Sequence, residues 1–299
     1  VHTVSPSYAD EILKPSDTPH FYGGEGLEKD LRLAHDQGRI YGILNGCTYP
    51  NDGPTPKPDF GTLLARLMPT VVAWSGMTDT VRASHFAAYA RITALAKRPE
   101  PPPVLCTCIG RLQPQKALLF QQTGTSPGTG LERLLNTLAD NGLLIVLGTG
   151  DAAYEQYFTR MAAGRENLLF LNGYSDACAE ALYAAGDLFV MPSSYEPCGI
   201  SQLLAMRAGQ PCLVHAVGGL RDTVTHGHNG FSFEGKNLID QVDRMALTFK
   251  EALDCIIREP GKWQTMRQNA AATRFPWTLS AQMYIKRLYV TFSRQSRRG

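Results

Sequence analysis

Short apolar runs alternate with amphipathic stretches through the middle of the chain. The runs are about four to six residues long, almost continuously apolar, and bounded by Gly, Pro or Asn, which is typical of parallel strands covered on both faces. We predict these strands at Val104–Ile109, Leu143–Leu147, Leu168–Leu171, Leu188–Met191 and Cys212–His215, with a short edge strand at Phe231–Phe233. The amphipathic stretches between them predict helices at Leu131–Ala139, Ala152–Ala163, Ala177–Ala185, Ser201–Ala208 and Leu220–Val224. This alternation predicts an α/β fold with a doubly wound parallel sheet.

The segments on either side of this region have weaker patterns. Residues 1–44 contain helix-like pieces between two strand-like runs, VHTVSP and YGILNG. Residues 51–58 predict a loop, which is followed by two helical stretches that reach Lys97 and by the stiff linker PEPPP. Residues 123–130 predict a flexible loop, and a last helix is expected at Trp277–Arg294. Because the first residue is Val in a strand-like run, we expect the chain to begin in the middle of a fold.

The charge balance gives no general attraction to polyanions. The chain has 299 residues, with 29 Lys and Arg against 27 Asp and Glu, so its formal net charge is +2. We therefore expect neither nucleic acid nor a membrane as a partner, and an anionic ligand must be held by a few placed cations. No apolar run approaches the roughly 20 residues that span a bilayer, and no secretory signal is visible.

The seven cysteines indicate reduced thiols rather than a disulfide framework, because several lie inside apolar runs. Cys106 and Cys108 stand two apart on a predicted strand and should face the same side. No second pair stands at zinc spacing, and His226 and His228 lie in a Gly/Asn turn without companion ligands. We expect a cytoplasmic protein without a metal or other cofactor.

Two cations follow the first strand of the predicted sheet. Arg111 and Lys116 stand five residues apart in Gly110-Arg-Leu-Gln-Pro-Gln-Lys, around a proline turn. Ligands of open parallel sheets bind beyond the carboxyl ends of the strands, and an arginine can bind two oxygens of a diphosphate at once. The alternative is a pair of solvated surface cations, and residue type with spacing leaves both open.

Two further loops lie at carboxyl ends of strands. Gly148-Thr-Gly-Asp151 permits close backbone approach to a ligand, although it lacks the third glycine of a dinucleotide fingerprint. Asp151 as a helix N-cap explains this loop nearly as well. Tyr174 follows the next strand and has the flat ring that stacks on a nucleobase, but it is equally compatible with a packing role.

The loop after the fourth strand is the most elaborate. It runs Pro192-Ser-Ser-Tyr-Glu-Pro-Cys-Gly-Ile-Ser-Gln202, so that Glu196 precedes a helix that opens near Gly199. A carboxylate accepts hydroxyl protons, and the backbone N–H groups of Cys198 to Ser201 meet other hydroxyls or phosphate. This combination suits a sugar. The alternative is that Glu196 is only a favourable charge at a helix amino-terminus.

Together these loops resemble the bacterial glycogen/starch synthases, which are retaining glycosyltransferases with two facing Rossmann-like domains (the GT-B fold). The matching text includes HTVSPSYADEI, YGILNG, GRLQPQK, VLGTGD, NGYSDA, the long run ALYAAGDLFVMPSSYEPCGISQLLAMRAGQPCLVHAVGGLRDTV and the terminal FPW…AQMYIKRLY. The EPCG-x-S-Q run followed by GGL-x-DTV is the most specific part. The resemblance implies the Rossmann-like donor domain of such an enzyme.

The resemblance also implies roles for ten residues. Arg111 and Lys116, next to Gly110, bind the donor diphosphate and neutralise charge on the departing ADP, and Tyr174 lies against the adenine. Glu196 positions the donor glucose. The remaining donor-site and cleft residues are the backbone groups of Cys198, Gly199 and Ile200, the Ser201 side chain near a phosphate, and Asn45 near the reacting sugar.

The implied reaction transfers glucose from ADP-glucose to the 4-hydroxyl at the non-reducing end of an α-1,4-glucan, with retention and without a cofactor. The implied organisation is a remnant of the acceptor-side domain at 1–45, a nucleotide-sugar domain at 46–275, and a helix at 276–299 that would cross back to a missing amino-terminal domain. We therefore expect poor activity from the isolated chain. Two alternatives stay open: a non-catalytic nucleotide- or glucan-binding module, and a related transferase that uses another nucleotide sugar.

Overall fold

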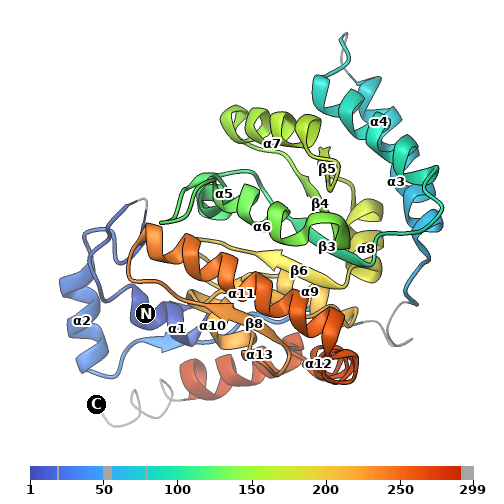
Figure 1. Cartoon of the computed structure of the whole chain (residues 1–299). Coiled ribbons are helices and arrows are strands. Elements are labelled where there is room, and N and C mark those ends of the chain that lie inside the picture. The colour runs from blue at the N-terminus through green and yellow to red at the C-terminus, as the bar shows by residue number, and fades with distance from the viewer. Residues whose placement is uncertain (19, 50–55, 78–79, 291–299) are drawn as a thin grey trace.

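The computed structural model describes residues 1–18, 20–49, 56–77 and 80–290. Its centre is a six-stranded parallel sheet, in which the strands lie side by side in the order β5-β4-β3-β6-β7-β8 (Figure 1). The strands are β3 (Val104–Ile109), β4 (Gly142–Gly148), β5 (Leu168–Asn172), β6 (Leu188–Met191), β7 (Cys212–His215) and β8 (Gly230–Phe233). All six predicted strands are confirmed; three have the predicted bounds and the others are one residue longer at one or both ends.

The strand order places a topological switch point between β3 and β6. The chain first moves outward from β3 through β4 to β5, then returns to the other side of β3 and moves outward from β6 to β8. At such a reversal the crossover helices lie on opposite faces, which leaves a crevice beyond the carboxyl ends of the two central strands. The doubly wound α/β fold predicted from the sequence is therefore confirmed.

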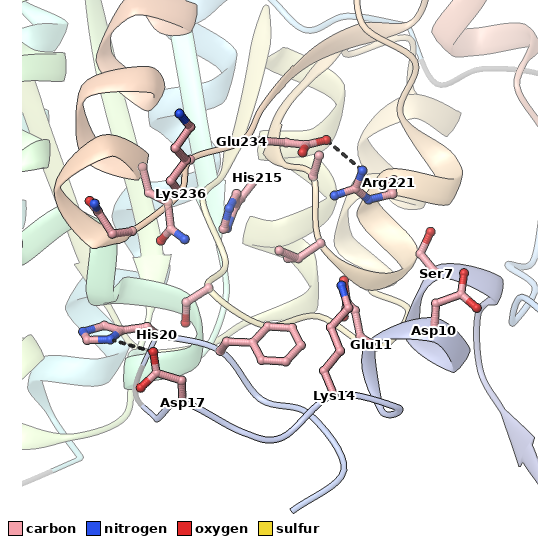
Figure 2. A pocket seen from close by; sticks show the side chains of 17 residues that line it. Ser7, Asp10, Glu11, Lys14, Asp17, His20, His215, Arg221, Glu234 and Lys236 are labelled. Carbon is pink, nitrogen blue, oxygen red and sulfur yellow. Dashed lines mark hydrogen bonds and ion pairs between the residues drawn. The ribbon is translucent and has the colours of Figure 1, made fainter. Parts of the chain in front are cut away.

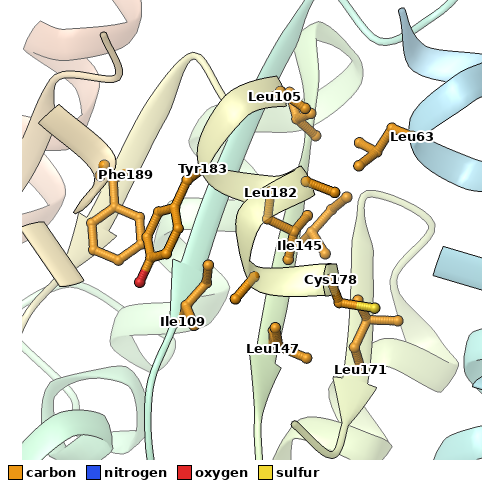
Figure 3. Close-up of a cluster of buried hydrophobic side chains, with 14 of the residues drawn as sticks. Leu63, Leu105, Ile109, Ile145, Leu147, Leu171, Cys178, Leu182, Tyr183 and Phe189 are labelled. Atoms are coloured by element: carbon orange, nitrogen blue, oxygen red, sulfur yellow. The ribbon is translucent and has the colours of Figure 1, made fainter. Parts of the chain in front are cut away.

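Strands β3 to β7 each contribute to two hydrophobic cores, because their side chains alternate between the two faces of the sheet, whereas the edge strand β8 contributes only to the second. One core contains Ile145, Leu147 and Phe189 and packs against α3 (Phe60–Ser75), α4 (Ala83–Ala96), α8 (Asp176–Ala185) and α9 (Ser201–Arg207) (Figure 3). The other contains Leu144, Val146 and Val190 and packs against α5 (Pro114–Gln121), α6 (Gly130–Leu138), α7 (Ala152–Gly164), α11 (Leu238–Arg258) and α12 (Pro260–Ala272). Coverage on both faces explains why the strands are apolar throughout.

The helices include two that the sequence interpretation missed. Residues 114–121 form α5, whose first turn begins at Pro114, so Lys116 lies on a helix rather than in a proline turn. This correction follows from the preference of proline for the first helical turn, where a missing N–H costs no hydrogen bond. The second is α11, the long amphipathic helix before Pro260. The loop predicted at 123–130 lies between α5 and α6, and Thr129 and Glu132 form a capping box that starts α6.

The prediction that Cys106 and Cys108 face the same side of their strand is confirmed. Cys106 and Cys108 both contact the core that contains Leu144, and all seven cysteines are free thiols. Burial raises the pKa of Cys108 to about 12, so its thiol stays protonated. Among the described residues, no group of three or more His, Cys, Asp or Glu side chains is arranged to hold a metal.

The amino-terminal residues lie at the end of the molecule opposite α3 and α4 (Figure 1). They form β1 (His2–Thr3), α1 (Pro6–Glu11), α2 (Glu28–Asp36) and β2 (Tyr41–Gly42), with β1 and β2 paired in parallel. The helix α1 packs against α10 (Gly218–Thr223), which follows β7. Two contacts join them: the hydroxyl and backbone N–H of Ser7 donate to Asp222 at 2.7 and 2.9 Å, and the backbone N–H of Gly218 donates to Glu11 at 2.7 Å.

The carboxy-terminal helix returns to these amino-terminal residues. It comprises α13 (Trp277–Tyr284) and the π-helical turn η2 (Ile285–Tyr289), and Ser280 donates to the carbonyl oxygen of Leu44 at 2.7 Å. Of the predicted helix 277–294, residues 291–294 lie outside the described residues, as do 51–55 of the predicted loop 51–58. No helix in the described part of the chain is long and apolar enough to cross a membrane.

Candidate functional site at the ends of β3 and β6

A cavity of about 690 Å³ opens beyond the carboxyl ends of β3 and β6, at the switch point of the sheet. All ten residues selected from the sequence line it: Asn45, Gly110, Arg111, Lys116, Tyr174, Glu196, Cys198, Gly199, Ile200 and Ser201. We call it the donor cavity, after the role that the family resemblance implies for these residues. Its position agrees with the rule that ligands of open parallel sheets bind where the strand order reverses.

Arg111 lies in the short connection between β3 and α5. The connection is fixed on the neighbouring strand: the N–H of Gly110 donates to the carbonyl of Leu147 at 3.1 Å, and that of Leu112 donates to Thr149 at 3.0 Å. The Arg111 side chain is exposed and forms no hydrogen bond or ion pair with any described residue. Its guanidinium is therefore available to a ligand, whereas its backbone is held in place.

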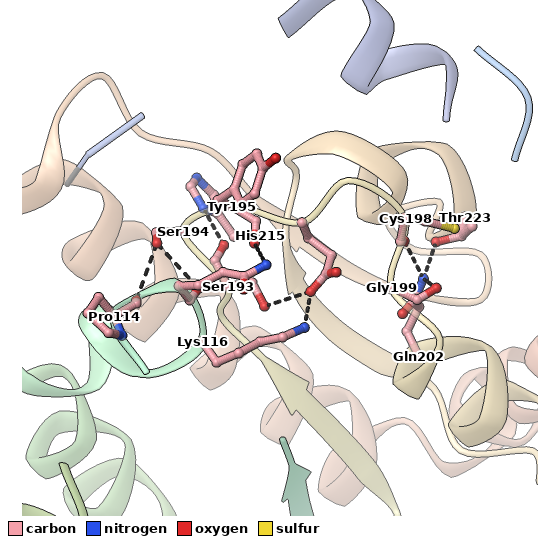
Figure 4. Close-up of polar contacts among 12 residues, drawn as sticks. Pro114, Lys116, Ser193, Ser194, Tyr195, Cys198, Gly199, Gln202, His215 and Thr223 are labelled. Atoms are coloured by element: carbon pink, nitrogen blue, oxygen red, sulfur yellow. Dashed lines mark hydrogen bonds and ion pairs between the residues drawn. The ribbon is translucent and has the colours of Figure 1, made fainter. Parts of the chain in front are cut away.

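Lys116 lies in the first turn of α5 and forms an ion pair with Glu196. Figure 4 shows its side chain reaching from α5 toward the loop that carries Ser193 and Tyr195. Only 19% of the lysine side chain and 8% of the glutamate side chain are exposed. The Ser193 hydroxyl also donates to Glu196, at 3.4 Å. The interpretation of Lys116 as a solvated surface cation is therefore wrong.

The loop that carries Glu196 is held through its backbone by three other parts of the chain. The N–H of Ser194 donates to the carbonyl of Gln115, and the Gln115 amide donates to the carbonyl of Tyr195, both at 2.9 Å. The N–H of Gly219 donates to the carbonyl of Glu196 at 3.0 Å. The Ser5 hydroxyl donates to the carbonyl of Pro197. These hydrogen bonds fix the backbone that carries the Glu196 carboxylate.

Glycines allow other backbone segments to approach this loop closely. Gly218 has φ +43°, and a Cβ there would overlap the carbonyl oxygen of Glu196. Gly199 has φ +77°, and the Gln202 amide donates back to its carbonyl at 3.1 Å, which closes the turn into α9. Since L residues rarely adopt such angles, glycine is required at both positions.

Cys198 and Asn45 meet at the side of the cavity nearest the amino-terminal residues. Burial raises the pKa of the Cys198 thiol to about 11, although a backbone hydrogen bond from Asn45 opposes this shift. The thiol is therefore protonated at neutral pH and is no nucleophile. Asn45 itself is held by a backbone hydrogen bond to Val4 at 3.3 Å. The amino-terminal residues are therefore part of the cavity wall.

Tyr174 forms the rim of the cavity on the β5 side. Its ring is 60% exposed, and its hydroxyl donates to Asp176 at 2.8 Å, which raises its pKa. The preceding Gly173 packs on the indole of Trp74. A packing role in the core is excluded for Tyr174, and its exposed ring leaves a flat apolar face beside the cavity.

Several cavity residues were not found from the sequence. Tyr183 and Leu204 supply apolar wall and Gln115 supplies a polar group, whereas Thr149 belongs to the Gly148–Asp151 loop that the sequence had already singled out. Gln115 could have been predicted from the sequence, because it is a polar residue next to Lys116 in the segment expected to bind the diphosphate. Tyr183 could not, since an aromatic residue in an amphipathic helix is usually core.

The chain is similar to known glycosyltransferases. Residues 129–270 match the family model described as glycosyl transferases group 1. The chain is 35% identical over 291 residues to glycogen synthases of Streptococcus gordonii and Streptococcus sanguinis, covering 95% of this chain and 54% of each relative. It thus spans about half the length of the curated relatives it matches. The structure resembles the catalytic domain of starch synthase IV from Arabidopsis thaliana bound to ADP and acarbose, with a TM-score of 0.66 and 25% identity, over 96% of this chain and 54% of that one.

The doubly wound fold is that of the Rossmann-like domains of GT-B glycosyltransferases, and the family match lies within it. More particularly, the chain is a homologue of the bacterial glycogen synthases and corresponds to their carboxy-terminal portion. The family resemblance stated from the sequence motifs is confirmed.

Proposed function

We propose that the chain is the donor-binding part of a glucan synthase that transfers glucose from ADP-glucose to the 4-hydroxyl at the non-reducing end of an α-1,4-glucan, with retention of configuration. One observation carries the proposal. Two cations from the β3–α5 segment and a carboxylate from the loop after β6 line the same cavity at the switch point. Groups that must contact the diphosphate and the sugar of a single donor are therefore within reach of one ligand.

The arrangement suggests how the diphosphate is held. Arg111 has no partner in the described structure and can bind two phosphate oxygens. Lys116 is paired with Glu196 and lines the same cavity, so it can exchange part of that pairing for a phosphate. Both cations then oppose the negative charge that builds on the departing ADP, which lowers the energy of the transition state.

The sugar end of the donor would lie against the Glu196 loop. The Glu196 carboxylate accepts hydroxyl protons, and the backbone N–H groups of Cys198, Gly199 and Ile200 donate to other oxygens. Ser201, at the start of α9, would reach a phosphate, and Asn45 would lie near the reacting carbon. By the family resemblance, the leaving phosphate accepts the proton of the incoming hydroxyl, and no protein nucleophile is required.

The organisation of the whole enzyme is part of the same proposal. Residues 1–45 would belong to the acceptor-side domain, 46–275 to the nucleotide-sugar domain, and 276–299 to a helix that crosses back. The exposure of Trp277, Leu279 and Tyr289 on the terminal helix supports the last part of this division. Seven free cysteines support a cytoplasmic location.

The nucleotide site is tested by calorimetric titration of the 299-residue chain with ADP. Replacing Arg111 by Ala removes a charge-assisted interaction of roughly 1.5–3 kcal/mol, so we expect the Kd for ADP to rise about ten- to hundredfold. Arg66→Ala is the matched control, because Arg66 is an exposed arginine on α3 outside the cavity. Equal affinity for ADP in all three proteins contradicts the proposed site.

The reaction is tested separately by glucose incorporation into glycogen from radiolabelled ADP-glucose. Catalysis needs groups from both domains held together, so we expect little turnover from the chain alone and a gain when a separately expressed amino-terminal half is added. Robust turnover by the bare chain would show that the proposed division of labour is wrong. Competition among ADP, UDP and GDP decides the nucleotide, and ADP should bind tightest.

A further inference from the structure

A second cavity lies behind the loop that follows β6. It has a volume of about 580 Å³ and lies between the amino-terminal residues and the carboxyl ends of β7 and β8 (Figure 2). We call it the rear cavity. It shares no lining residue with the donor cavity: Ser194 and His215 line the rear cavity, whereas Glu196 lines the donor cavity. The loop after β6 therefore separates the two cavities, and His215 lies behind it.

The Glu196 carboxylate is held by one of its two oxygens. Its Oε2 accepts from Nζ of Lys116 and, at 3.4 Å, from the Ser193 hydroxyl. Its Oε1 forms no hydrogen bond with any described residue. The two hydrogen bonds fix the orientation of the carboxylate, and Oε1 is left for a ligand in the cavity that Glu196 lines.

Ser193 is fully buried, and its backbone is held by His215. The carbonyl of Ser193 accepts from Nδ1 of His215 at 3.0 Å (Figure 4). Ser193 follows β6 and His215 ends β7, and these strands are paired as far as Met191 and Val214. The side chain of His215 therefore joins the two segments beyond the point where the backbone pairing ends.

The His215 ring has a fixed position and a defined tautomer. It is 3% exposed and stacks on Phe233 of β8, with ring centroids 5.0 Å apart and an angle of 11° between the planes. A carbonyl oxygen only accepts, so Nδ1 of His215 carries the hydrogen. Burial lowers the pKa of His215 to about 4, so the ring is neutral at pH 7 and keeps this tautomer.

From these contacts we propose that His215 and Ser193 are positioning residues, which hold the Glu196 carboxylate so that its Oε1 faces the sugar of the donor. His215 fixes the backbone of Ser193, and the Ser193 hydroxyl fixes Oε2 together with Lys116. Neither His215 nor Ser193 lines the donor cavity, so both act through Glu196. The inference rests on the proposed function, because it assigns the sugar to Glu196.

The experiment measures the Kd of the 299-residue chain for ADP-glucose and for ADP by calorimetric titration. ADP lacks the sugar and reports on the phosphate and base contacts alone. We expect Ser193→Ala to raise the Kd for ADP-glucose about three- to tenfold, while the Kd for ADP stays within about twofold. Ser194→Ala is the matched control, because this neighbouring buried hydroxyl donates to the Gln115 carbonyl instead. It should leave the ratio of the two Kd values unchanged.

A second pair of variants tests His215. His215→Leu removes the donor to Ser193, and it should weaken ADP-glucose binding selectively, as Ser193→Ala does. His215→Asn places an amide N–H near the position of Nδ1, so it should restore the Kd for ADP-glucose to within about twofold of the natural chain. Thermal unfolding shows which variants are folded. If His215→Leu does not fold, the two serine variants decide the inference.

Three results would overturn the inference. The first is equal affinity of the natural chain for ADP-glucose and ADP, which would mean that Glu196 does not bind the sugar. The second is an equal rise of both Kd values in Ser193→Ala, which would make its role a general structural one. The third is equal weakening in folded His215→Leu and His215→Asn. Failure of the donor site itself is distinct, since the Kd for ADP would then be insensitive to Arg111→Ala, and the inference would fall with it.

Discussion

The donor cavity and the rear cavity lie on opposite sides of one loop and differ in how they are built. The donor cavity follows from the sheet itself, because β3 and β6 end at the switch point and glycines let backbone segments close around Glu196. The rear cavity exists because α1 docks on α10 and closes a space over β7 and β8. The position of the first cavity follows from the switch point of the sheet. The second cavity depends on the contact between α1 and α10, which are far apart in the sequence.

The two cavities also differ in the charges that line them. The donor cavity has one unpaired cation, Arg111, beside a buried ion pair of Lys116 and Glu196. The rear cavity has nearly balanced charges, most of them near solvent. The first arrangement suits an anion attached to a sugar, whereas the second has no excess of one charge. Changes in the donor cavity should therefore alter ADP binding, whereas protonation of His215 at the rear cavity should alter stability.

The largest loss of stability is expected from breaking the buried ion pair of Lys116 and Glu196. Lys116→Ala leaves the Glu196 carboxylate, 8% exposed, without its counter-charge, and such a loss costs about 3 kcal/mol or more. We expect this fall in the free energy of unfolding by urea denaturation, together with loss of ADP binding. The double variant Lys116→Met/Glu196→Gln should recover most of the stability but not the ADP binding.

The control for this pair is Lys29→Ala, at an exposed position on α2, which should change the stability by less than about 0.5 kcal/mol. If Lys116→Ala is as stable as the control, then the pair contributes nothing, and the Glu196 carboxylate is stabilised by Ser193 and the surrounding backbone instead.

A smaller fall in the free energy of unfolding is expected on acidification, through His215 beside the rear cavity. Burial lowers the pKa of His215 to about 4, although the Ser193 carbonyl at 3.0 Å from Nδ1 and the nearby Glu234 favour the protonated form; the charge of Arg221 opposes it. Between pH 4 and 6.5 the unfolded chain binds a proton there and the folded chain does not, so stability falls as pH falls through this window. At pH 4.5 this difference corresponds to about 2 kcal/mol.

The measurement compares urea unfolding at pH 7 and pH 4.5. His215→Gln should lose about 2 kcal/mol less than the natural chain on acidification, and His35→Gln, on the exposed surface of α2, should behave like the natural chain. Identical losses in all three proteins would mean that His215 is protonated within the folded rear cavity.

The sheet was predictable from the sequence because strands covered on both faces are apolar throughout, so each appears as an uninterrupted run. The donor cavity followed, since loops after parallel strands share one edge. The helix α11 was also within reach: Val242, Met245, Phe249 and Leu253 are spaced three and four apart and are buried on one face. The rear cavity was not, because the docking of Ser7 and Glu11 on α10 leaves no local pattern.

The smallest effect is expected at the rim of the donor cavity. Tyr174 is 60% exposed and hydrogen-bonded to Asp176, so removing its ring should cost little stability. If the ring lies against the base of the nucleotide, stacking contributes about 0.5–1.5 kcal/mol, and Tyr174→Ala should raise the Kd for ADP about two- to tenfold. Tyr174→Phe keeps the ring and loses only the hydroxyl, so it should bind ADP like the natural chain.

Tyr89→Ala, at an exposed tyrosine on α4 outside both cavities, controls for loss of an aromatic side chain. A Kd for ADP that rises in Tyr174→Phe as much as in Tyr174→Ala would assign the contribution to the hydroxyl, and the base would then lie elsewhere.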